Sequence, residues 1–218
     1  MTWTDTRARV GLLATSLIFG ALVTALAAGA QPEAARNLIV NGNAEQGEAS
    51  PNGYDVVADV PGWTRKGGFT VVEYGAADFP SVQTASAIGG GGKFFAGGPG
   101  NAGSGVTQTV DVSSKRALID SGKGKATLSG YLGGYGGQND SLSAVATFLG
   151  QTGKRLGAIK IGPVTAAERK LATGLLKKSK VGPVPKKTRT VRVTLGANRT
   201  AGSYNDGYAD NLSLTIGR

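Results

Sequence analysis

Glycine divides this chain into short segments, and this division restricts the folds that are open to it. The sequence holds 36 glycines in 218 residues, many of them in pairs, and they separate short runs rich in Val, Leu, Thr and Tyr. Such runs, bounded by turn-forming residues, are typical of an all-β domain with many turns. The strands that this pattern predicts are residues 38–40, 69–74, 93–96, 105–112, 126–132, 142–149, 156–161, 189–195 and 210–216.

Several of these runs alternate between apolar and polar residues. Between residues 190 and 195, Val191, Val193 and Leu195 alternate with Thr and Arg. A period of two places the apolar side chains on one face of a strand and the polar ones on the other. So many short strands in one domain of this length predict two sheets packed face to face.

One segment has the pattern of a helix instead. Thr165 and Glu168 form a capping box around two alanines, and Leu171 and Leu175 follow at helical spacing. Lysines gather near the end of the segment, where the helix dipole favours positive charge. We therefore predict one short surface helix over residues 166–178, inserted between two strands. Its basic side is either a binding patch or a solvated helix face.

The N-terminal 30 residues have the pattern of a secretory signal peptide. Arginines precede an apolar run over residues 10–28, which leads into the small-x-small sequence Ala-Gly-Ala that ends at Ala30. We predict a signal peptide over residues 1–30 and one domain over residues 31–218, secreted or associated with the cell envelope. The alternative is an anchor that stays uncleaved. No later stretch is apolar enough to span a bilayer, so no stable membrane span is expected after cleavage.

Basic residues outnumber acidic ones in the predicted domain. Without Arg7, Arg9 and Asp5, which precede the expected cleavage point, 22 of the 24 basic and 13 of the 14 acidic side chains remain, a formal net charge of +9. Charge of this sign favours polyanions or acidic cell-wall polymers as partners through long-range attraction. Simple solubility explains the same charge equally well.

Cysteine and histidine are both absent from the sequence. Without disulfides, an exported domain must be held together by its core or by a metal with oxygen ligands. Without histidine there is no Ser-His-Asp triad, no Cys-His pair and no ordinary zinc site. Hydrolysis by a pair of carboxylates is the main hydrolytic chemistry left open.

Residues 37–47 read Asn-Leu-Ile-Val-Asn-Gly-Asn-Ala-Glu-Gln-Gly, and residues 206–214 read Asp-Gly-Tyr-Ala-Asp-Asn-Leu-Ser-Leu. These segments resemble the opening and closing strands of the galactose-binding-like jelly-roll superfamily, which includes many carbohydrate-binding modules. Residues 60–63, 108–110 and 128–131 resemble an internal turn and two strands of the same superfamily. The resemblance implies a two-sheet jelly-roll β-sandwich, from which the predicted surface helix is a departure.

In that superfamily a structural calcium commonly ties the first strand to the last through a glutamate and an aspartate. The matching positions here are Glu45 and Asp210, and the carbonyl of Asn43 is a further candidate ligand. Calcium takes six to eight oxygen ligands, so two carboxylates with neighbouring carbonyls suit it. The resemblance therefore implies a structural calcium at these three residues. The alternative is that both carboxylates are ordinary turn residues.

Carbohydrate binding needs aromatic faces for sugar rings and polar groups that read the hydroxyls. Two glycine-rich segments and one tryptophan offer them. The candidate ligand-binding residues are Trp63, Tyr131, Tyr135, Gln138, Asp140, Tyr204 and Asp206. Tyr135 and Tyr204 lie among glycines and polar residues, which is an exposed context. Packing in the core is the alternative for each aromatic residue, and above all for Trp63.

We predict a non-catalytic exported module that binds carbohydrate or a cell-wall polysaccharide. Two alternatives stay open. One is a structural or adhesion protein of the envelope that binds through its charge. The other is a glycan-processing enzyme that uses two carboxylates among Glu45, Asp140, Asp206 and Asp210. Nucleic acid is not expected as a partner, because the aromatic residues are not interleaved with Lys and Arg.

Overall fold

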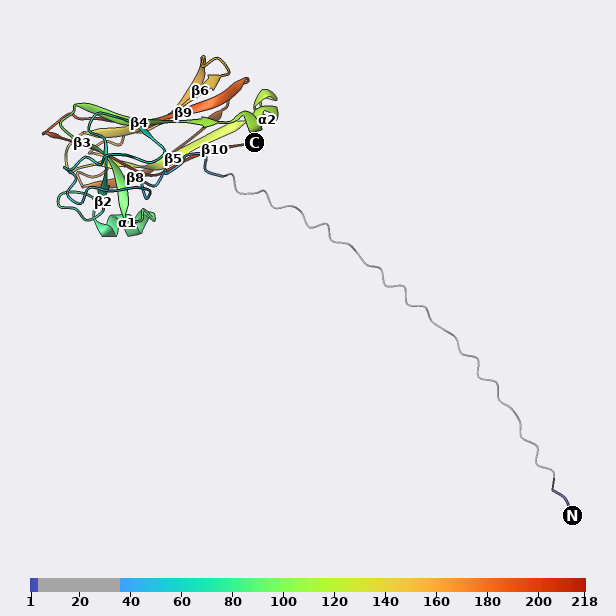
Figure 1. The fold of residues 1–218 in the computed structure, drawn as a ribbon. Helices are drawn as coiled ribbons and strands as arrows, with labels where there is room; N and C mark the ends of the chain where they lie inside the picture. The colour runs from blue at the N-terminus through green and yellow to red at the C-terminus, as the bar shows by residue number, and fades with distance from the viewer. Residues whose placement is uncertain (4–35) are drawn as a thin grey trace. The chain divides into compact units, whose positions relative to one another are not determined.

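The computed structural model describes residues 1–3 and 36–218 (Figure 1). The apolar run and the cleavage point of the predicted signal peptide lie outside these residues. Ala35–Arg218 form one compact unit. Within the described residues, no helix has both the length and the hydropathy to cross a membrane.

Two antiparallel sheets of five strands each make up this unit. We name them the β9 sheet and the β10 sheet after their central strands. The β9 sheet contains, in spatial order, β1 (Thr64–Lys66), β4 (Gly103–Asp111), β9 (Thr188–Asn198), β6 (Ser141–Gly150) and β7 (Arg155–Ile161). The β10 sheet contains β2 (Thr70–Glu73), β3 (Lys93–Pro99), β10 (Tyr204–Gly217), β5 (Lys125–Gly134) and β8 (Gly174–Pro183). The predicted all-β fold with two packed sheets is confirmed.

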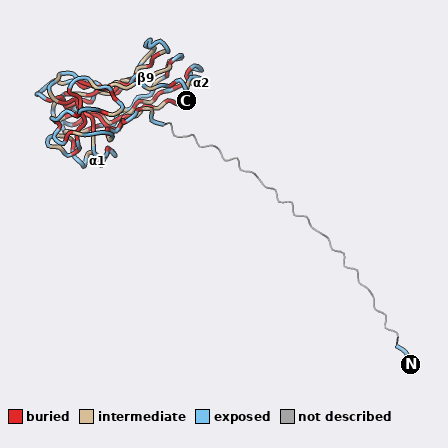
Figure 2. The backbone as a smooth tube through the Cα atoms, in the orientation of Figure 1, coloured by how far each residue is buried: buried red, intermediate tan, exposed pale blue. Residues whose placement is uncertain are grey.

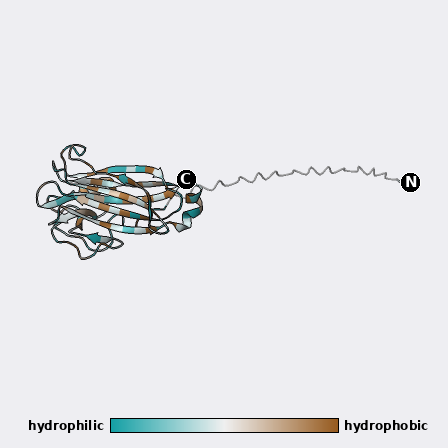
Figure 3. Cartoon of the chain, turned by 90° about the horizontal axis from the view of Figure 1, so that it is seen from above, coloured by the Kyte–Doolittle hydropathy of each residue, from teal (hydrophilic) through white to brown (hydrophobic). Residues whose placement is uncertain are grey.

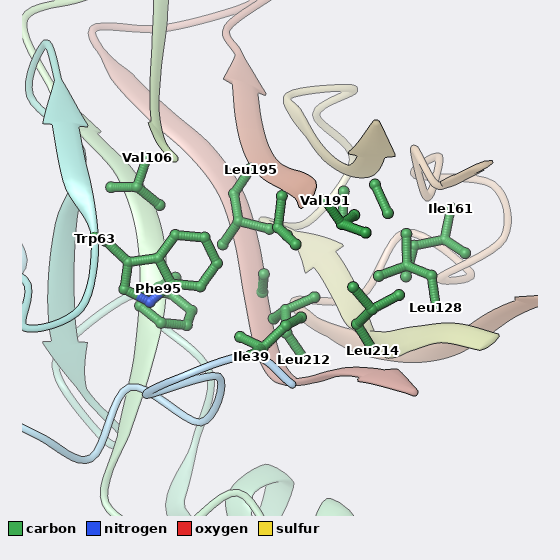
Figure 4. Close-up of a cluster of buried hydrophobic side chains, with 14 of the residues drawn as sticks. Ile39, Trp63, Phe95, Val106, Leu128, Ile161, Val191, Leu195, Leu212 and Leu214 are labelled. Atoms are coloured by element: carbon green, nitrogen blue, oxygen red, sulfur yellow. The ribbon is translucent and has the colours of Figure 1, made fainter. Parts of the chain in front are cut away.

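The main core lies between the two sheets, as the alternating pattern predicts. In β9, Val191, Val193 and Leu195 are fully buried and point into it, and Leu214 of β10 reaches it from the opposite sheet (Figure 4). Burying such side chains contributes about 1.5–3 kcal/mol each. Along the strands, hydrophobic and hydrophilic residues alternate (Figure 3). This core replaces the disulfides that the sequence lacks.

The β10 sheet also buries part of its outer face. On β3, Phe95 points into the main core while Phe94 packs in a second cluster with Val72, Tyr74 and Tyr208. Helix α1 (Val82–Ile88) and the loop before it contribute to this outer cluster. Buried residues are therefore concentrated in the part of the molecule around β2, β3 and β10 (Figure 2). Because β2 and β3 are covered on both faces there, each contains consecutive buried apolar residues, such as Val71 and Val72 or Phe94 and Phe95.

The predicted strand at residues 38–40 does not form a ladder. Leu38 N–H donates to the carbonyl of Leu214 (2.8 Å), but the next contacts use side chains. Asn37 Oδ1 accepts from Leu214 N–H (2.9 Å), and Gln108 Oε1 accepts from Val40 N–H (3.0 Å). The other predicted strands all form. Side-chain bonds of this kind replace ladder bonds and cannot be read from an apolar run.

The helix predicted over residues 166–178 is wrong beyond its first turn. The capping box forms, because Glu168 accepts from Thr165 N–H (2.8 Å) and Thr165 Oγ1 accepts from Glu168 N–H (3.2 Å). Lys170 and Leu171 then adopt left-handed conformations with φ of 55° and 60°, which end the turn. The chain continues as β8, which pairs with β5 along its whole length. Pairing with a sheet edge outweighs local helix propensity here.

The helices that do form are short and lie elsewhere. α1 begins after Ser81, whose hydroxyl accepts from Thr84 N–H (3.2 Å), and ends at Gly89 in the left-handed conformation. The 3₁₀ turn η1 (Ser113–Lys115) runs into α2 (Arg116–Asp120). In Figure 1, α2 lies near the C-terminus, at the end of the sandwich where β10 finishes. These helices carry no long apolar period, and the sequence pattern did not indicate them.

Candidate functional site

A pocket of about 230 Å³ opens at the end of the sandwich where β10 begins. The β5–β6 and β9–β10 loops form part of it, and two segments from the first half of the chain complete it. The lining residues are Tyr54, Asp78, Phe79, Tyr135, Gln138, Gly202, Ser203, Tyr204 and Asp206. Four of the predicted ligand-binding residues are among them, brought together from two loops. We call this the tyrosine pocket.

Close backbone contacts bring the two loops together. Tyr208 of β10 pairs with Gly133 of β5, near the point where β5 ends. A Cβ atom on Gly134 would lie 2.8 Å from the carbonyl oxygen of Asp206, and one on Gly207 would lie 2.5 Å from that of Ser141. Only glycine fits these approaches. Gly134 and Gly207 are therefore packing requirements of the pocket.

Arg169 holds one of the loops that form the pocket, and it was not predicted as a site residue. Its Nη2 donates to the carbonyls of Tyr135 (3.1 Å), Gly136 (3.0 Å) and Gln138 (3.0 Å), and its Nε donates to that of Ala172 (3.1 Å). The side chain is buried, and this burial lowers the pKa of Arg169. One guanidinium thus holds the β5–β6 loop in place. The sequence did not indicate this role of Arg169, because the capping box predicted a surface helix in that segment.

Asp140 also holds the pocket together, which corrects its prediction as a ligand-binding residue. The side chain is fully buried. Its Oδ1 accepts from Thr200 Oγ1 (2.9 Å) and from the backbone of Thr200 and Ala201, and its Oδ2 accepts from Asp206 N–H (3.1 Å). These bonds leave no accessible face for a ligand. Asp140 therefore positions the β9–β10 loop against the β5–β6 loop.

Three buried polar atoms in this region have no partner within the part of the chain that the structure describes. They are Gln138 Oε1, Arg169 Nη1 and Tyr204 Oη. Buried polar groups are nearly always hydrogen-bonded, and leaving one unpaired costs about 1–3 kcal/mol. Gln138 and Tyr204 line the tyrosine pocket, whereas Arg169 does not line it but donates to the loop that carries Gln138. The three atoms have almost no accessible surface, so a ligand could reach them only after a side chain moves.

The aromatic residues of the pocket are arranged edge to face. Tyr204 contacts Tyr54 with ring centroids 5.3 Å apart at 67°, and Phe79 with centroids 5.3 Å apart at 77°. Tyr204 is 6% exposed and Tyr54 is 61% exposed. The ring open to a ligand is therefore that of Tyr54, while Tyr204 is packed behind it with its hydroxyl buried. Tyr54 and Phe79 were missed because they lie in loops with no strand pattern.

Asp206 and Asp78 are the two acidic residues that line the pocket. Burial raises the pKa of the Asp206 carboxyl to about 6, and the negative charges of Asp140 and Asp78 add to the rise. A hydrogen bond from Tyr208 Oη and the charge of Arg169 oppose it. A carboxyl of this kind accepts hydrogen bonds at neutral pH and becomes a donor when protonated.

Two further predicted ligand-binding residues, like Asp140, do not line the pocket. Trp63 is 7% exposed, donates from Nε1 to the carbonyl of Asn41 (3.2 Å) and packs edge-on against Phe95, as Figure 4 shows. It belongs to the main core, so its prediction as a binding residue is wrong. Tyr131 lies in β5 opposite Lys177 and Asp210 and packs against the outer cluster. It is half-buried and does not line the tyrosine pocket.

The two carboxylates of the implied calcium site come together from opposite ends of the chain. A Cβ atom on Gly91 would lie 2.6 Å from Glu45 Oε1, and one on Gly90 would lie 2.5 Å from Asp210 Oδ2. Glu45 Oε1 accepts from the N–H groups of Gly92 (3.0 Å) and Lys93 (2.9 Å). The two acidic side chains thus flank one glycine turn.

Asp210 is fully buried and has only neutral hydrogen-bond partners, namely Tyr74 Oη (2.7 Å) and Asn211 N–H (2.6 Å). Burial raises the pKa of Asp210 to about 7, these two hydrogen bonds oppose the rise, and the charge of Glu45 adds to it. Among the described residues, no cationic side chain lies within salt-bridge distance of it. A bound cation would relieve this uncompensated charge, and an all-oxygen environment suits calcium.

The rest of the implied ligand set is not assembled. Asn43 is exposed and lines a shallow hollow with Asn211 and Ser213. Lys93 Nζ already donates to the carbonyls of Glu45 (3.3 Å) and Gly47 (2.6 Å). In residues 36–218 no three His, Cys, Asp or Glu side chains come together as a metal site would require. The carboxylate pair fits a cation, and the remaining ligands would have to be carbonyls or water.

Comparison with known proteins gives structural neighbours only. No protein-family model and no curated protein matches the sequence. The chain is similar to the structure "Family 16 Carbohydrate Binding Module-2", with 19% identity and a TM-score of 0.49 over 82% of this chain and 99% of that one. It is also similar to the CBM22-1 xylan-binding domain of Paenibacillus barcinonensis Xyn10C, with 13% identity and a TM-score of 0.41 over 76% of this chain and 91% of that one.

A third similar structure is the enzymatically active domain of bacteriophage CBA120 tailspike protein 4, with 16% identity and a TM-score of 0.48. The match covers 83% of this chain, which spans only 21% of that tailspike chain. The structural neighbours thus include carbohydrate-binding modules, the class of domain that the two ends of the sequence resemble. At these identities and TM-scores, the ligand and its site have to be argued from the residues of this chain.

Proposed function

We propose that this protein binds a polysaccharide in the tyrosine pocket without turning it over. The observation that carries the proposal is the lining of this pocket, in which Gln138 offers an amide and Asp78 and Asp206 offer carboxylates. Sugar hydroxyls both donate and accept, so one ring can bond to an amide and a carboxylate together. The exposed ring of Tyr54 lies beside them, where it can pack against the apolar face of the same sugar.

The direct test removes one polar group that lines the pocket. Gln138→Met deletes an amide whose oxygen has no hydrogen-bond partner among the described residues, so the melting temperature should stay nearly the same. Binding to a soluble neutral polysaccharide, such as xylan in affinity electrophoresis, should weaken about tenfold, because a sugar hydroxyl loses its partner. Gln83→Met, at an exposed position of α1, is the matched control.

Two outcomes would contradict the proposal. The first is a wild-type protein that binds no member of a panel of neutral polysaccharides. The second is a Gln138→Met variant that melts earlier but binds as well as the wild type, because the amide would then have a structural role.

A second candidate function is hydrolysis of the bound glycan. It is favoured by one observation, that Asp78 and Asp206 both line the pocket and the pKa of Asp206 is raised to about 6 by burial. A general acid with a raised pKa beside a second carboxylate is the arrangement that glycoside hydrolases use. Release of reducing sugar by the wild type and its loss in Asp206→Asn would establish this function in place of simple binding.

We further propose that a calcium ion binds between Glu45 and Asp210. The supporting observation is the buried Asp210 carboxylate, whose described partners are all neutral. A site of micromolar affinity in millimolar calcium would stabilise the fold by roughly 4 kcal/mol. Calcium should therefore raise the melting temperature of the wild type but not of Asp210→Asn. An identical melting curve in calcium and in chelator would exclude the ion.

The proposal places the domain outside the cell, in keeping with the signal peptide expected over residues 1–30. Mass spectrometry of exported protein should give an N-terminus at Gln31. Recovery of the intact N-terminus in a membrane fraction would show an uncleaved anchor instead.

A further inference from the structure

A second pocket lies at the opposite end of the sandwich. Its volume is about 590 Å³, and the β6–β7 turn, the β8–β9 loop and the end of α2 surround it. The lining residues are Asp120, Gly150, Gln151, Thr152, Lys154, Leu156, Lys186, Lys187 and Arg189. β9 begins beside this pocket and ends in the loop that forms the tyrosine pocket. We call it the basic pocket.

The one acidic residue of the basic pocket is already used by the protein. Asp120 Oδ2 accepts from Arg189 Nη2 (2.7 Å), and its Oδ1 accepts from Arg189 Nη1 (3.1 Å) and from Lys187 N–H (2.9 Å). These bonds hold the β8–β9 loop against α2, with Lys187 in the left-handed conformation at φ 67°. Asp120 therefore fixes the shape of the pocket, and its negative charge is paired with Arg189.

Three ammonium groups are left without a counter-ion. In the described part of the chain, no carboxylate lies within salt-bridge distance of Lys154, Lys186 or Lys187. Like charges that converge on one concave surface repel one another and raise the local positive potential. An anionic ligand would relieve this repulsion, so the charge of the pocket specifies the sign of its ligand.

The remaining lining residues narrow the ligand class. Leu156 and the aliphatic stems of the lysines give an apolar wall, while Gln151 and Thr152 offer an amide and a hydroxyl. A sugar acid has a matching set of groups, namely a C–H face, hydroxyls and a carboxylate. No aromatic residue lines the pocket, which disfavours single-stranded nucleic acid, and none of its residues is an exposed large hydrophobic that would enter a membrane.

We propose that the basic pocket binds the anionic sugar residues of an acidic polysaccharide. This inference is independent of the tyrosine pocket, since the two share no lining residue. Because β10 spans 14 residues between the two ends, the pockets lie roughly 40 Å apart. Two different polymer chains can therefore occupy one molecule at once.

The probe for this proposal is polygalacturonate, with its fully methyl-esterified form as the neutral counterpart. The variant Lys154→Gln, Lys186→Gln removes two exposed charges and leaves Asp120, Lys187 and Arg189 in place. The matched control is Lys66→Gln, Lys160→Gln, which removes two exposed charges on the β9 sheet away from both pockets. The two double variants have the same net charge, so they differ only in where on the surface the charges are removed.

We expect the pocket variant to bind polygalacturonate at least tenfold more weakly than the wild type, and the control less than twofold more weakly. The methyl-esterified polymer should bind much more weakly than the acid form. Equal losses in the two variants would overturn the proposal, because net charge alone would then explain the binding. Equal affinity for duplex DNA or anionic vesicles would overturn the assignment to acidic sugars.

A failure here is distinguishable from a failure of the proposed function. Binding of neutral xylan tests only the tyrosine pocket, and the lysine variant should leave it unchanged. If xylan binds and polygalacturonate does not, the basic pocket is excluded while the tyrosine pocket stands.

Discussion

The two ends of this sandwich differ in how far their polar groups are exposed to solvent. At the tyrosine pocket, Tyr204 and Asp206 are buried and Gln138 is half-buried. At the basic pocket, Lys154 and Lys186 are exposed to solvent. A desolvated hydrogen-bonding group gains much from a partner, whereas a solvated charge gains little from any single contact. One end should therefore select by geometry and the other by charge.

The largest expected difference between the ends follows from removing Arg169. Arg169→Met deletes four hydrogen bonds from a buried guanidinium to loop carbonyls, so we expect a loss of roughly 3 kcal/mol in the free energy of unfolding and loss of neutral polysaccharide binding. Polygalacturonate binding at the opposite end should persist in the folded fraction. Chemical denaturation and affinity electrophoresis would measure both. Arg192→Met, an exposed arginine of β9, is the control and should change neither.

The second largest expected difference between the two ends is in the salt dependence of ligand binding. Raising the ionic strength from about 50 to 500 mM shortens the Debye length to a few ångströms, so polygalacturonate binding should fall about tenfold or more. Neutral polysaccharide binding should change less than twofold, since no net charge is neutralised. Titration calorimetry at several salt concentrations gives both slopes. Parallel slopes would mean that one charge-driven surface binds both polymers.

Exposed aromatic surface provides a third contrast. Tyr54→Ala removes the accessible ring of the tyrosine pocket, and the loss of a stacking ring costs about 1–3 kcal/mol in comparable binding sites. Neutral polysaccharide binding should weaken about tenfold, with the melting temperature nearly unchanged because the ring is 61% exposed. Tyr54→Phe keeps the ring and should bind almost as the wild type does. Equal loss in both variants would assign the contact to the hydroxyl rather than to the ring.

The regular part of this fold could be predicted from the sequence, and the loops that make the site could not. A period of two identifies β9 and β6 because every second side chain enters the core. The capping box at Thr165 is also correct as local chemistry, but it forms only one turn before Lys170 and Leu171 reverse the chain. Pairing with the β5 edge decides the rest, and a local pattern contains no information about that edge.

The residues of the candidate site likewise divide into those that the sequence could predict and those that it could not. Tyr135, Gln138, Tyr204 and Asp206 were predictable because polar and aromatic residues among glycines at strand ends indicate a loop surface. Arg169 was not, because its role depends on carbonyls of a loop about thirty residues earlier in the chain. Tyr204 also shows the limit of this reasoning, since its glycine-rich and polar context suggested exposure while packing buries it. Burial is a property of the whole fold and not of the segment.

The smallest expected effect is a pH dependence that belongs to the tyrosine pocket alone. The carboxyl of Asp206 faces Asp140, Asp78, Arg169 and Tyr208, and burial raises its pKa to about 6, against about 3.9 in an unfolded chain. The folded state then binds more protons than the unfolded state between these values. The stabilising contribution of this proton is complete below about pH 4 and is lost as the pH rises through about 6.

Since the carboxyl borders an open pocket, solvent reduces the contribution to about 1–2 kcal/mol. The stability of the wild type relative to Asp206→Asn should therefore increase by this amount between pH 8 and pH 4, as measured by urea denaturation. Carboxyl groups elsewhere, including Asp210 and Asp120, titrate in both proteins and cancel in the difference. The lysine variant of the basic pocket should show the wild-type pH dependence throughout. A flat difference would mean that Asp206 is as well solvated as the lysines at the other end, and the contrast between a buried and a hydrated pocket would then be lost.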